Sequence, residues 1–214
     1  MDIAIFAKAP QIGFAKTRLI PELGAAGAAR LQRRLTMHAL QLAARFRPAN
    51  VTLWCAPGTD HRFFRALASR LDLALCCQVG GDLGMRMSTA FAAHGGPLLL
   101  IGTDCPALHT GHLHEAANLL HSGHDAVFIP AEDGGYVLVG LRRPQPYLFE
   151  RIDWGSESVM AHTRERLTRL GLRWAEPATL WDVDRPADLA RLAMLEGFGD
   201  YAPSRVKARF RQSE

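Results

Sequence analysis

Apolar residues alternate along the chain between short continuous runs and longer stretches with helical spacing. The clearest run, Leu98 to Ile101, leads into Gly102, Asp104 and Pro106. A continuous apolar run of this length is typical of a strand buried on both faces, as in the centre of a parallel sheet. Pro106 has no N–H to donate to a sheet and therefore stops the strand. The pattern places Asp104 at the carboxyl end of a central strand, where open α/β sheets bind their ligands.

Strand-like runs alternate with helix-like stretches, which predicts βαβ units and a mainly parallel sheet. Strands are expected at residues 3–8, 51–55, 73–78, 98–104, 126–130, 136–141 and 173–177. Helices are expected at residues 23–46, 60–71, 84–94, 110–121, 156–170 and 185–195. The Asp-Gly-Gly sequence at 133–135 predicts a hairpin-like turn between two antiparallel strands. Without a repeat or an internal linker, we expect one domain over residues 1–203, followed by a basic tail over 204–214.

Composition is that of an ordinary globular protein. Of the 214 residues, 48% are hydrophobic and 21% charged, and no apolar run approaches the roughly 18 residues that cross a bilayer. The amino terminus reads directly as a strand, and the four cysteines lack zinc-ligand spacing, so we expect a cytoplasmic protein. The net charge of +4 suits acidic small molecules such as nucleotides. A nucleic-acid partner is only weakly supported and ranks last, because no recognised binding motif accompanies the positive charge. The oligomeric state is left open.

The loop after the first strand, within residues 6–19, contains one glycine and three cations. Backbone N–H groups and cations in such a loop are suited to binding phosphates. The loop matches neither the Walker P-loop nor the dinucleotide fingerprint Gly-x-Gly-x-x-Gly. A solvated surface loop is the alternative for any single cation. The candidates for nucleotide binding here are Phe6, Ala7, Lys8, Gly13, Lys16 and Arg18.

A second candidate stretch, residues 78–87, follows the third expected strand and contains three glycines. Glycines so close together indicate a sharp turn or a close approach to a ligand. Gln78 offers both a donor and an acceptor, which suits the edge of a nucleobase. Arg86 faces either a phosphate or, alternatively, Asp82 in a salt bridge. The nucleotide-binding candidates are Gln78, Gly80, Gly81, Asp82 and Arg86, with Thr103 after the central strand.

Three further carboxylates complete the candidate chemistry. Asp133 begins the 133–135 turn and needs no function to explain it. Asp182 and Asp184 lie on the same side of an extended segment, because side chains alternate along such a segment. Together with Asp104 they would repel one another unless a cation lay between them, and Mg²⁺ prefers oxygen ligands. Alternatively, Asp184 and Asp104 merely cap the helices that follow them, although the gap from Asp104 to its helix is long for a cap.

Five stretches in this order resemble a known family. The sequence is similar to the bacterial glycosyltransferase-A-like family related to 2-phospho-lactate guanylyltransferase, within the nucleotide-diphospho-sugar transferase superfamily. The resemblance implies a Rossmann-like three-layer α/β/α fold with a mixed, mainly parallel central sheet. The stretches are Phe6-Ala7-Lys8-Ala9-Pro10 with Gly13 and Lys16-Thr17-Arg18-Leu19; Gln78 with Gly80-Gly81-Asp82-Leu83-Gly84 and Arg86-Met87; Gly102-Thr103-Asp104-Cys105-Pro106; Asp133-Gly134-Gly135-Tyr136; and Asp182-Val183-Asp184-Arg185-Pro186 with Asp188-Leu189.

The resemblance also implies roles for single residues. Asp104 takes the place of the superfamily's metal-binding aspartate, and Asp182 or Asp184 lies near its second metal carboxylate. Lys16 falls where nucleotidyltransferases keep a phosphate-contacting lysine, and Gln78 falls where the base is read. Two departures bear on the reaction. The sequence at 103–105 has one carboxylate where many glycosyltransferases have Asp-x-Asp, and Lys-Ala-Pro at 8–10 replaces a glycine-rich opening.

We therefore expect a transferase that uses Mg²⁺ (or Mn²⁺) and acts on a nucleoside triphosphate or a nucleotide sugar. In the nucleotidyl version, a phosphorylated small molecule attacks the α-phosphorus, while Lys16, Arg18 and the metal stabilise the phosphate charge. In the glycosyl alternative, an acceptor hydroxyl attacks the sugar carbon, and Asp133 orients or deprotonates it. A second alternative is a nucleotide-binding module without catalysis. The expected catalytic residues are Lys16, Asp104 and Asp133, and the expected metal ligands are Asp104, Asp182 and Asp184.

Overall fold

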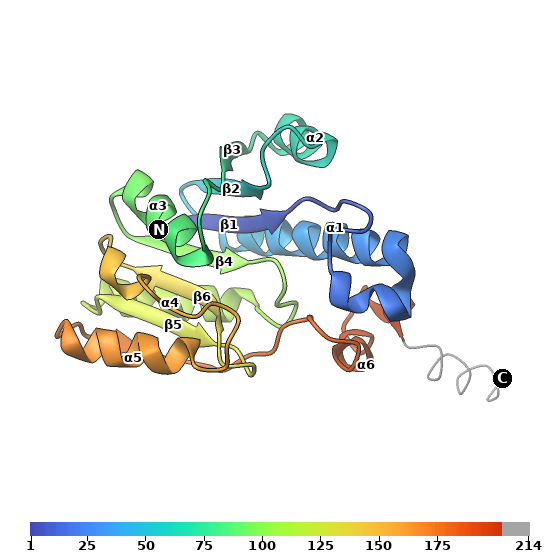
Figure 1. Cartoon of the computed structure of the whole chain (residues 1–214). Coiled ribbons are helices and arrows are strands. Elements are labelled where there is room, and N and C mark those ends of the chain that lie inside the picture. The colour runs from blue at the N-terminus through green and yellow to red at the C-terminus, as the bar shows by residue number, and fades with distance from the viewer. Residues whose placement is uncertain (203–214) are drawn as a thin grey trace.

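Seven strands form one mixed sheet in the order β3-β2-β1-β4-β6-β5-β7 in the computed structural model, which describes residues 1–202 (Figure 1). Neighbouring strands are parallel except at β6, which runs antiparallel to both β4 and β5. The expected antiparallel pair across the 133–135 turn is therefore confirmed, and the predicted tail over 204–214 lies outside the described residues. The strands are β1 (Asp2–Lys8), β2 (Val51–Ala56), β3 (Ala74–Cys77), β4 (Leu98–Gly102), β5 (Ala126–Pro130), β6 (Tyr136–Leu141) and β7 (Trp174–Ala175).

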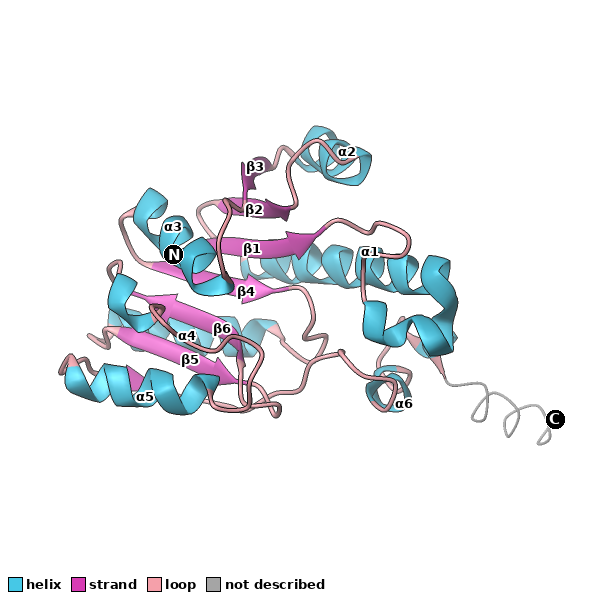
Figure 2. Ribbon diagram, viewed as in Figure 1, coloured by secondary structure: helices cyan, strands magenta, loops and turns pink. Residues whose placement is uncertain are grey.

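Helices cover both faces of this sheet (Figure 2). Alternation along β1 sends Ile3 and Ile5 into a core shared with α1, α2 and α4, while Ala4 and Phe6 enter a core shared with α3 and α5. This three-layer arrangement confirms the predicted fold class. The helices are α1 (Ile20–Phe46), α2 (Arg62–Leu71), α3 (Leu83–His94), α4 (Thr110–His121), α5 (Val159–Arg169) and α6 (Asp188–Leu192), with 3-10 turns at Thr17–Leu19, Pro146–Leu148 and Gly199–Tyr201.

A third hydrophobic cluster attaches the C-terminal segment to the first half of α1. Leu31 and Leu35 of α1 pack there with Trp181, Val183 and other buried residues from the end of the described chain. This packing places the segment around residue 182 beside the loop between β1 and α1. Residues that are distant in the sequence are thereby placed at one edge of the sheet.

The last expected helix, at 185–195, is shorter in the structure and begins at Asp188. The carboxylate of Asp188 accepts hydrogen bonds from the backbone N–H groups of Asp184 and Arg185, at 2.9 and 2.6 Å. Those residues therefore form a turn ahead of the helix, whose N-cap is Ala187, so the alternative in which Asp184 caps this helix is not formed. None of the helices described, up to residue 202, has the length and apolar character needed to cross a membrane.

Candidate functional site

The site is built at the carboxyl ends of two adjacent parallel strands. β1 and β4 are paired in register, with Phe6 opposite Gly102. The loops that follow these strands therefore leave the sheet side by side, at the edge where α/β proteins bind ligands. The side chains of Phe6 and Ala7 are buried, so only their backbone is available to a ligand, whereas Lys8 and Gly13 are exposed.

Lys16 joins the two loops to the C-terminal segment. Its ammonium lies 2.9 Å from a carboxylate oxygen of Asp104 and donates a hydrogen bond to the carbonyl oxygen of Val183. The backbone N–H of Val183 in turn donates to the carbonyl oxygen of Asp104 at 2.8 Å. The Lys16 side chain is 5% exposed and the Asp104 side chain 47% exposed. A nearly buried cation thus holds together three segments, and its partner carboxylate faces solvent.

Two buried polar side chains orient the Asp104 carboxylate through hydrogen bonds. The Gln32 side-chain amide on α1 donates to the hydroxyl of Thr103 at 3.1 Å, and that hydroxyl donates to a carboxylate oxygen of Asp104 at 3.3 Å. Gln32 and Thr103 are both buried. Thr103 was expected to bind the nucleotide, and Gln32 was not expected at the site. A glutamine on the apolar face of a long helix needs a buried hydrogen-bond partner, which is the signal in the sequence that points to it.

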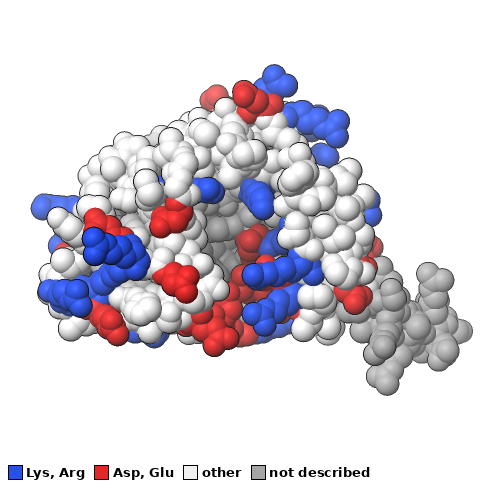
Figure 3. All heavy atoms as spheres, viewed as in Figure 1, with Lys and Arg blue, Asp and Glu red and all other residues white. Residues whose placement is uncertain are grey.

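Asp182 lies among like charges. Its pKa is raised to about 6, first by burial and then by repulsion from Asp133 and Asp104. Lys16 opposes this shift, and Asp184 adds to it more weakly. Figure 3 shows a hollow in this face of the molecule with acidic side chains below it and basic side chains to its right. Asp104, Asp133 and Asp182, which were all expected at the site, therefore come together from three segments that are far apart in the sequence.

The donor set at this edge fits a divalent ion that arrives with phosphates. Carboxylate oxygens of Asp104 and Asp182 are hard ligands, and Mg²⁺ takes one or two carboxylates while water and phosphate supply the rest. No group of three or more His, Cys, Asp or Glu side chains within residues 1–202 is arranged to hold a metal ion. Asp184 forms an ion pair with Arg18, and the roles of Asp104, Asp182 and Asp184 as metal ligands stay predictions.

We expect Asp182→Asn to raise the melting temperature of the ligand-free protein by about 2–4 °C at pH 7. The pKa of Asp182 lies above its ordinary value of 3.8, so the folded protein binds this proton more tightly than the unfolded chain does. The wild type therefore loses stability as the pH rises from 3.8 toward 6, and the loss is complete above 6. Thermal melts from pH 4 to 8 should show the two proteins converging at the acidic end. An advantage of the variant that is equal at every pH contradicts this account.

The turn that carries Asp133 depends on one glycine. Asp133 accepts a hydrogen bond from the N–H of Gly135 at 3.0 Å, which holds its carboxylate toward the turn. Gly134 has a φ of +92°, a conformation that L side chains rarely adopt, and a Cβ built there would lie 2.1 Å from the carbonyl oxygen of Glu157. The position of Asp133 therefore rests on the absence of a side chain at residue 134.

We expect Gly134→Ala to lower the free energy of unfolding by about 2 kcal/mol or more, because the new methyl group meets backbone in a strained turn. Gly135→Ala is the matched control, since a Cβ there meets only the Asp133 carboxylate, at 3.3 Å. Chemical denaturation should show a loss below about 1 kcal/mol for the control. Equal losses in the two variants count against the proposed contact.

The second candidate stretch lies beside the same edge, after β3. The side-chain amide of Gln78 donates to the carbonyl oxygens of Trp54 at 2.8 Å and Ala7 at 3.4 Å, which leaves its own oxygen as an acceptor. Asp82 caps α3 by accepting from the N–H of Met85 at 2.8 Å. The Nε of Arg86 is buried without a hydrogen-bond partner among the described residues, so the alternative salt bridge to Asp82 is not formed. The nucleotide-binding roles of Gly80, Gly81 and Arg86 stay predictions.

Comparison with known proteins agrees with this fold. Residues 39–156 match a family model described as "Uncharacterized protein conserved in bacteria (DUF2064)". A putative nucleotide-diphospho-sugar transferase from Desulfovibrio desulfuricans G20 is 31% identical, with a TM-score of 0.80, and the match covers 92% of this chain and 89% of that one. No curated protein sequence matches the chain significantly.

More distant structures share the fold. A nucleotidyl transferase from Methanothermobacter is 13% identical, with a TM-score of 0.61, over 89% of this chain and 95% of that one. Glucosyl-3-phosphoglycerate synthase from Mycobacterium tuberculosis, solved with Mn²⁺, uridine diphosphate and glucosyl-3-phosphoglycerate, is 11% identical, with a TM-score of 0.54, over 89% of this chain and 74% of that one. The resemblance to nucleotide-diphospho-sugar transferases is thus confirmed, and the closer relation to 2-phospho-lactate guanylyltransferase stays a prediction.

Proposed function

Because the chain belongs to the DUF2064 family and is similar to a putative nucleotide-diphospho-sugar transferase over most of its length, we propose that it is a metal-dependent nucleotidyltransferase. Its donor is a nucleoside triphosphate and its acceptor a phosphorylated small molecule. The observation that carries the proposal is the contact of Lys16 with Asp104, with Asp182 close enough to be repelled, at the carboxyl edge of the sheet. Cations and carboxylates that lie together at one edge of the sheet suit a phosphate chain held with a divalent ion.

Lys16 has the geometry of a phosphate-binding residue. An ammonium group carries three N–H donors, and two of them point to Asp104 and Val183. One donor is left for a phosphate oxygen, and the buried stem fixes its position. Arg18, at the rim and paired with Asp184, brings a second cation to the same loop. Such donors act on the charge that develops in phosphoryl transfer without needing to reorganise.

The proposed metal ligands are Asp104 and Asp182. A bound Mg²⁺ or Mn²⁺ would neutralise charge on the phosphates, which is what such ions supply in phosphoryl transfer. The chain's own contribution is to hold the two carboxylates: Gln32 and Thr103 fix Asp104, and the backbone of Val183 ties the neighbouring segment to it. Asp104 is thus held by contacts from α1, from the neighbouring Thr103 and from the segment around Val183.

The base is proposed to lie against Gln78 and the glycines after β3. The Gln78 amide nitrogen is bound to the backbone of β1 and β2, so its orientation is fixed. Its oxygen is therefore the atom available to a base, and it accepts rather than donates. A base that presents an N–H on its edge fits this position better than one that presents only carbonyl oxygens.

Glycosyl transfer is the second candidate function. One observation favours it: the Asp133 carboxylate is held in its turn by the N–H of Gly135 and lies near enough to Asp182 to repel it. A carboxylate fixed in this way is suited to orient or deprotonate an acceptor hydroxyl. In this version the metal holds the diphosphate that leaves with the nucleoside. A nucleotide-binding module without catalysis is the remaining alternative.

One experiment separates these functions. The protein is incubated with each nucleoside triphosphate and with a panel of nucleotide sugars, with Mg²⁺ or Mn²⁺ and with phosphorylated small molecules as acceptors. Pyrophosphate release from a triphosphate supports the proposal, and nucleoside diphosphate release from a nucleotide sugar supports glycosyl transfer. Thermal stabilisation by a nucleotide without either product supports the binding module, because a true ligand stabilises the fold by mass action.

A further inference from the structure

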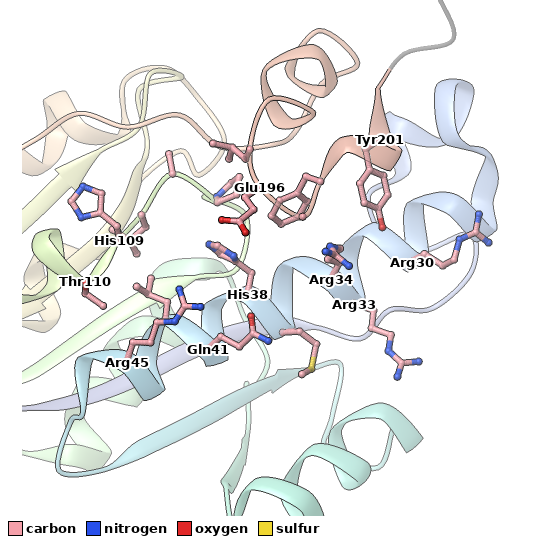
Figure 4. A pocket seen from close by; sticks show the side chains of 18 residues that line it. Arg30, Arg33, Arg34, His38, Gln41, Arg45, His109, Thr110, Glu196 and Tyr201 are labelled. Carbon is pink, nitrogen blue, oxygen red and sulfur yellow. The ribbon is translucent and has the colours of Figure 1, made fainter. Parts of the chain in front are cut away.

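A cavity of about 750 Å³ lies away from the Lys16–Asp104 site, along the side of α1 (Figure 4). Its walls are α1, the segment 106–110 that precedes and begins α4, and the segment 195–201. None of Lys16, Asp104 and Asp182 lines it. The cavity is therefore a second concave surface, separate from the proposed nucleotide site, although it shares with that site the loop that follows β4.

A stripe of basic and polar side chains runs along this cavity. Arg30, Arg34, His38, Gln41 and Arg45 follow one another on α1 at intervals of three or four residues, which puts them on one side of a helix. From residue 23 to its end, α1 contains no acidic residue. The only acidic side chain that lines the cavity within the described residues is Glu196. The cavity thus carries a strong excess of positive charge.

The guanidinium groups of this stripe are not neutralised by any residue in the described part of the chain, 1–202. Among the described residues, no ion pair or side-chain hydrogen bond is formed by Arg30, Arg34 or Arg45. Arg34 is oriented instead by the ring of Phe198, whose centroid lies 5.4 Å from its central carbon. Figure 4 shows Arg34, His38 and Gln41 on the helix face beside the cavity. Guanidinium donors without an acceptor among the described residues are suited to an anionic ligand.

We propose that this cavity binds a small molecule that carries two or more phosphate groups. A helix rises about 1.5 Å per residue, so Arg30 and Arg34 are about 6 Å apart along α1, and Arg45 lies about 16 Å beyond Arg34. A single phosphate that contacts Arg30 and Arg34 cannot also reach Arg45, whereas phosphates spread along one ligand can. The walls beside α1 and a volume within the range of small-molecule sites favour such a ligand over a nucleic acid. The proposal does not depend on the proposed transferase activity.

The test measures the binding of inorganic tripolyphosphate to the full chain by calorimetry, without added metal. The wild type is compared with Arg34→Ser/Arg45→Ser, with Lys16→Met, and with the matched control Arg65→Ser/Arg70→Ser, which removes two exposed arginines from α2. We expect the cavity variant to bind at least tenfold more weakly than the wild type. The Lys16 variant should keep a binding site for tripolyphosphate, and the control should bind within about twofold of the wild type, a difference that long-range charge alone accounts for.

Several results overturn the proposal. One is that wild type shows no binding, and another is that binding is lost in Lys16→Met but kept in the cavity variant, which places tripolyphosphate at the nucleotide site. Equal losses in the cavity variant and in the control show a diffuse charge effect. Binding of a single-stranded RNA without binding of tripolyphosphate identifies a nucleic-acid surface instead. If the double variant does not fold, the exposed single variant Arg45→Glu is used under the same criteria.

Discussion

Asp104→Asn should abolish metal-dependent nucleotide binding and lower turnover by about 100-fold or more. The substitution keeps the size of the side chain but removes the charge that the Lys16 ammonium contacts and that the proposed divalent ion would contact. Its support from Thr103 and Gln32 stays in place, so the change is electrostatic rather than a change of position. Calorimetry with the preferred nucleotide, with and without Mg²⁺, measures the effect. Unchanged magnesium-dependent affinity in the variant removes Asp104 from the site.

The same substitution has a cost in stability that must be separated from the loss of function. The Lys16 side chain is 5% exposed, so without Asp104 its charge is left with the Val183 carbonyl as its one remaining protein partner among the described residues. We expect the ligand-free protein to lose about 1–3 kcal/mol. Asp153→Asn, at an exposed residue outside the site, is the control and should leave both stability and binding unchanged. Circular dichroism at the assay temperature shows whether the variant is folded.

The fold could be predicted from the sequence because each strand of this protein has its own local signal. The run Leu98–Gly102 is apolar at every position up to its glycine, and it became the central strand β4. The bounds of α4, β5 and β6 were predicted to the residue, since turn residues mark their ends. The start of the last helix was misjudged because the Asp188 carboxylate binds the N–H of Arg185 and keeps that residue out of α6.

The candidate site could be predicted only as a set of residue types. Asp104 follows from the pattern, because an acidic residue after a buried strand is delivered to the sheet edge. The pairing of Lys16 with Asp104 does not follow, because it depends on a left-handed backbone at Lys16 and on the cluster that packs Val183 against α1. Gln32 was missed for the same reason, since its partner lies 71 positions further along the chain.

The arginine-lined cavity could not be predicted from the sequence either, because it too depends on contacts between distant segments. The net charge of +4 favours an acidic ligand without saying where it binds, and the spacing of Arg30, Arg34 and Arg45 shows only that they share a helix face. The cavity beside these exposed arginines is completed by segment 195–201, which the hydrophobic cluster around Phe198 holds against α1. Whether a charged helix face borders a cavity is thus decided by contacts between elements that are far apart in the sequence.

Lys16→Met should lower turnover by about 100-fold or more, while the ligand-free protein loses only about 1–2 kcal/mol of stability. The stability loss stays small because methionine fills the same buried space without the cost of desolvating an ammonium, whereas the loss of turnover is large because methionine donates nothing to a phosphate. Lys16→Arg keeps the charge but not the compact donor, and it should retain only part of the activity. Arg70→Met, on the exposed side of α2, is the matched control.

Turnover and thermal melts of these variants, measured side by side, distinguish a functional lysine from a structural one. A structural Lys16 predicts that melting temperature falls and that the remaining folded protein keeps full turnover per molecule. A phosphate-binding Lys16 predicts instead that turnover per folded molecule falls, with kcat falling more than KM rises if its remaining N–H acts on charge that develops during transfer. Full turnover in Lys16→Met contradicts the phosphate role whatever the melting temperature, because no other cation among the described residues contacts Asp104.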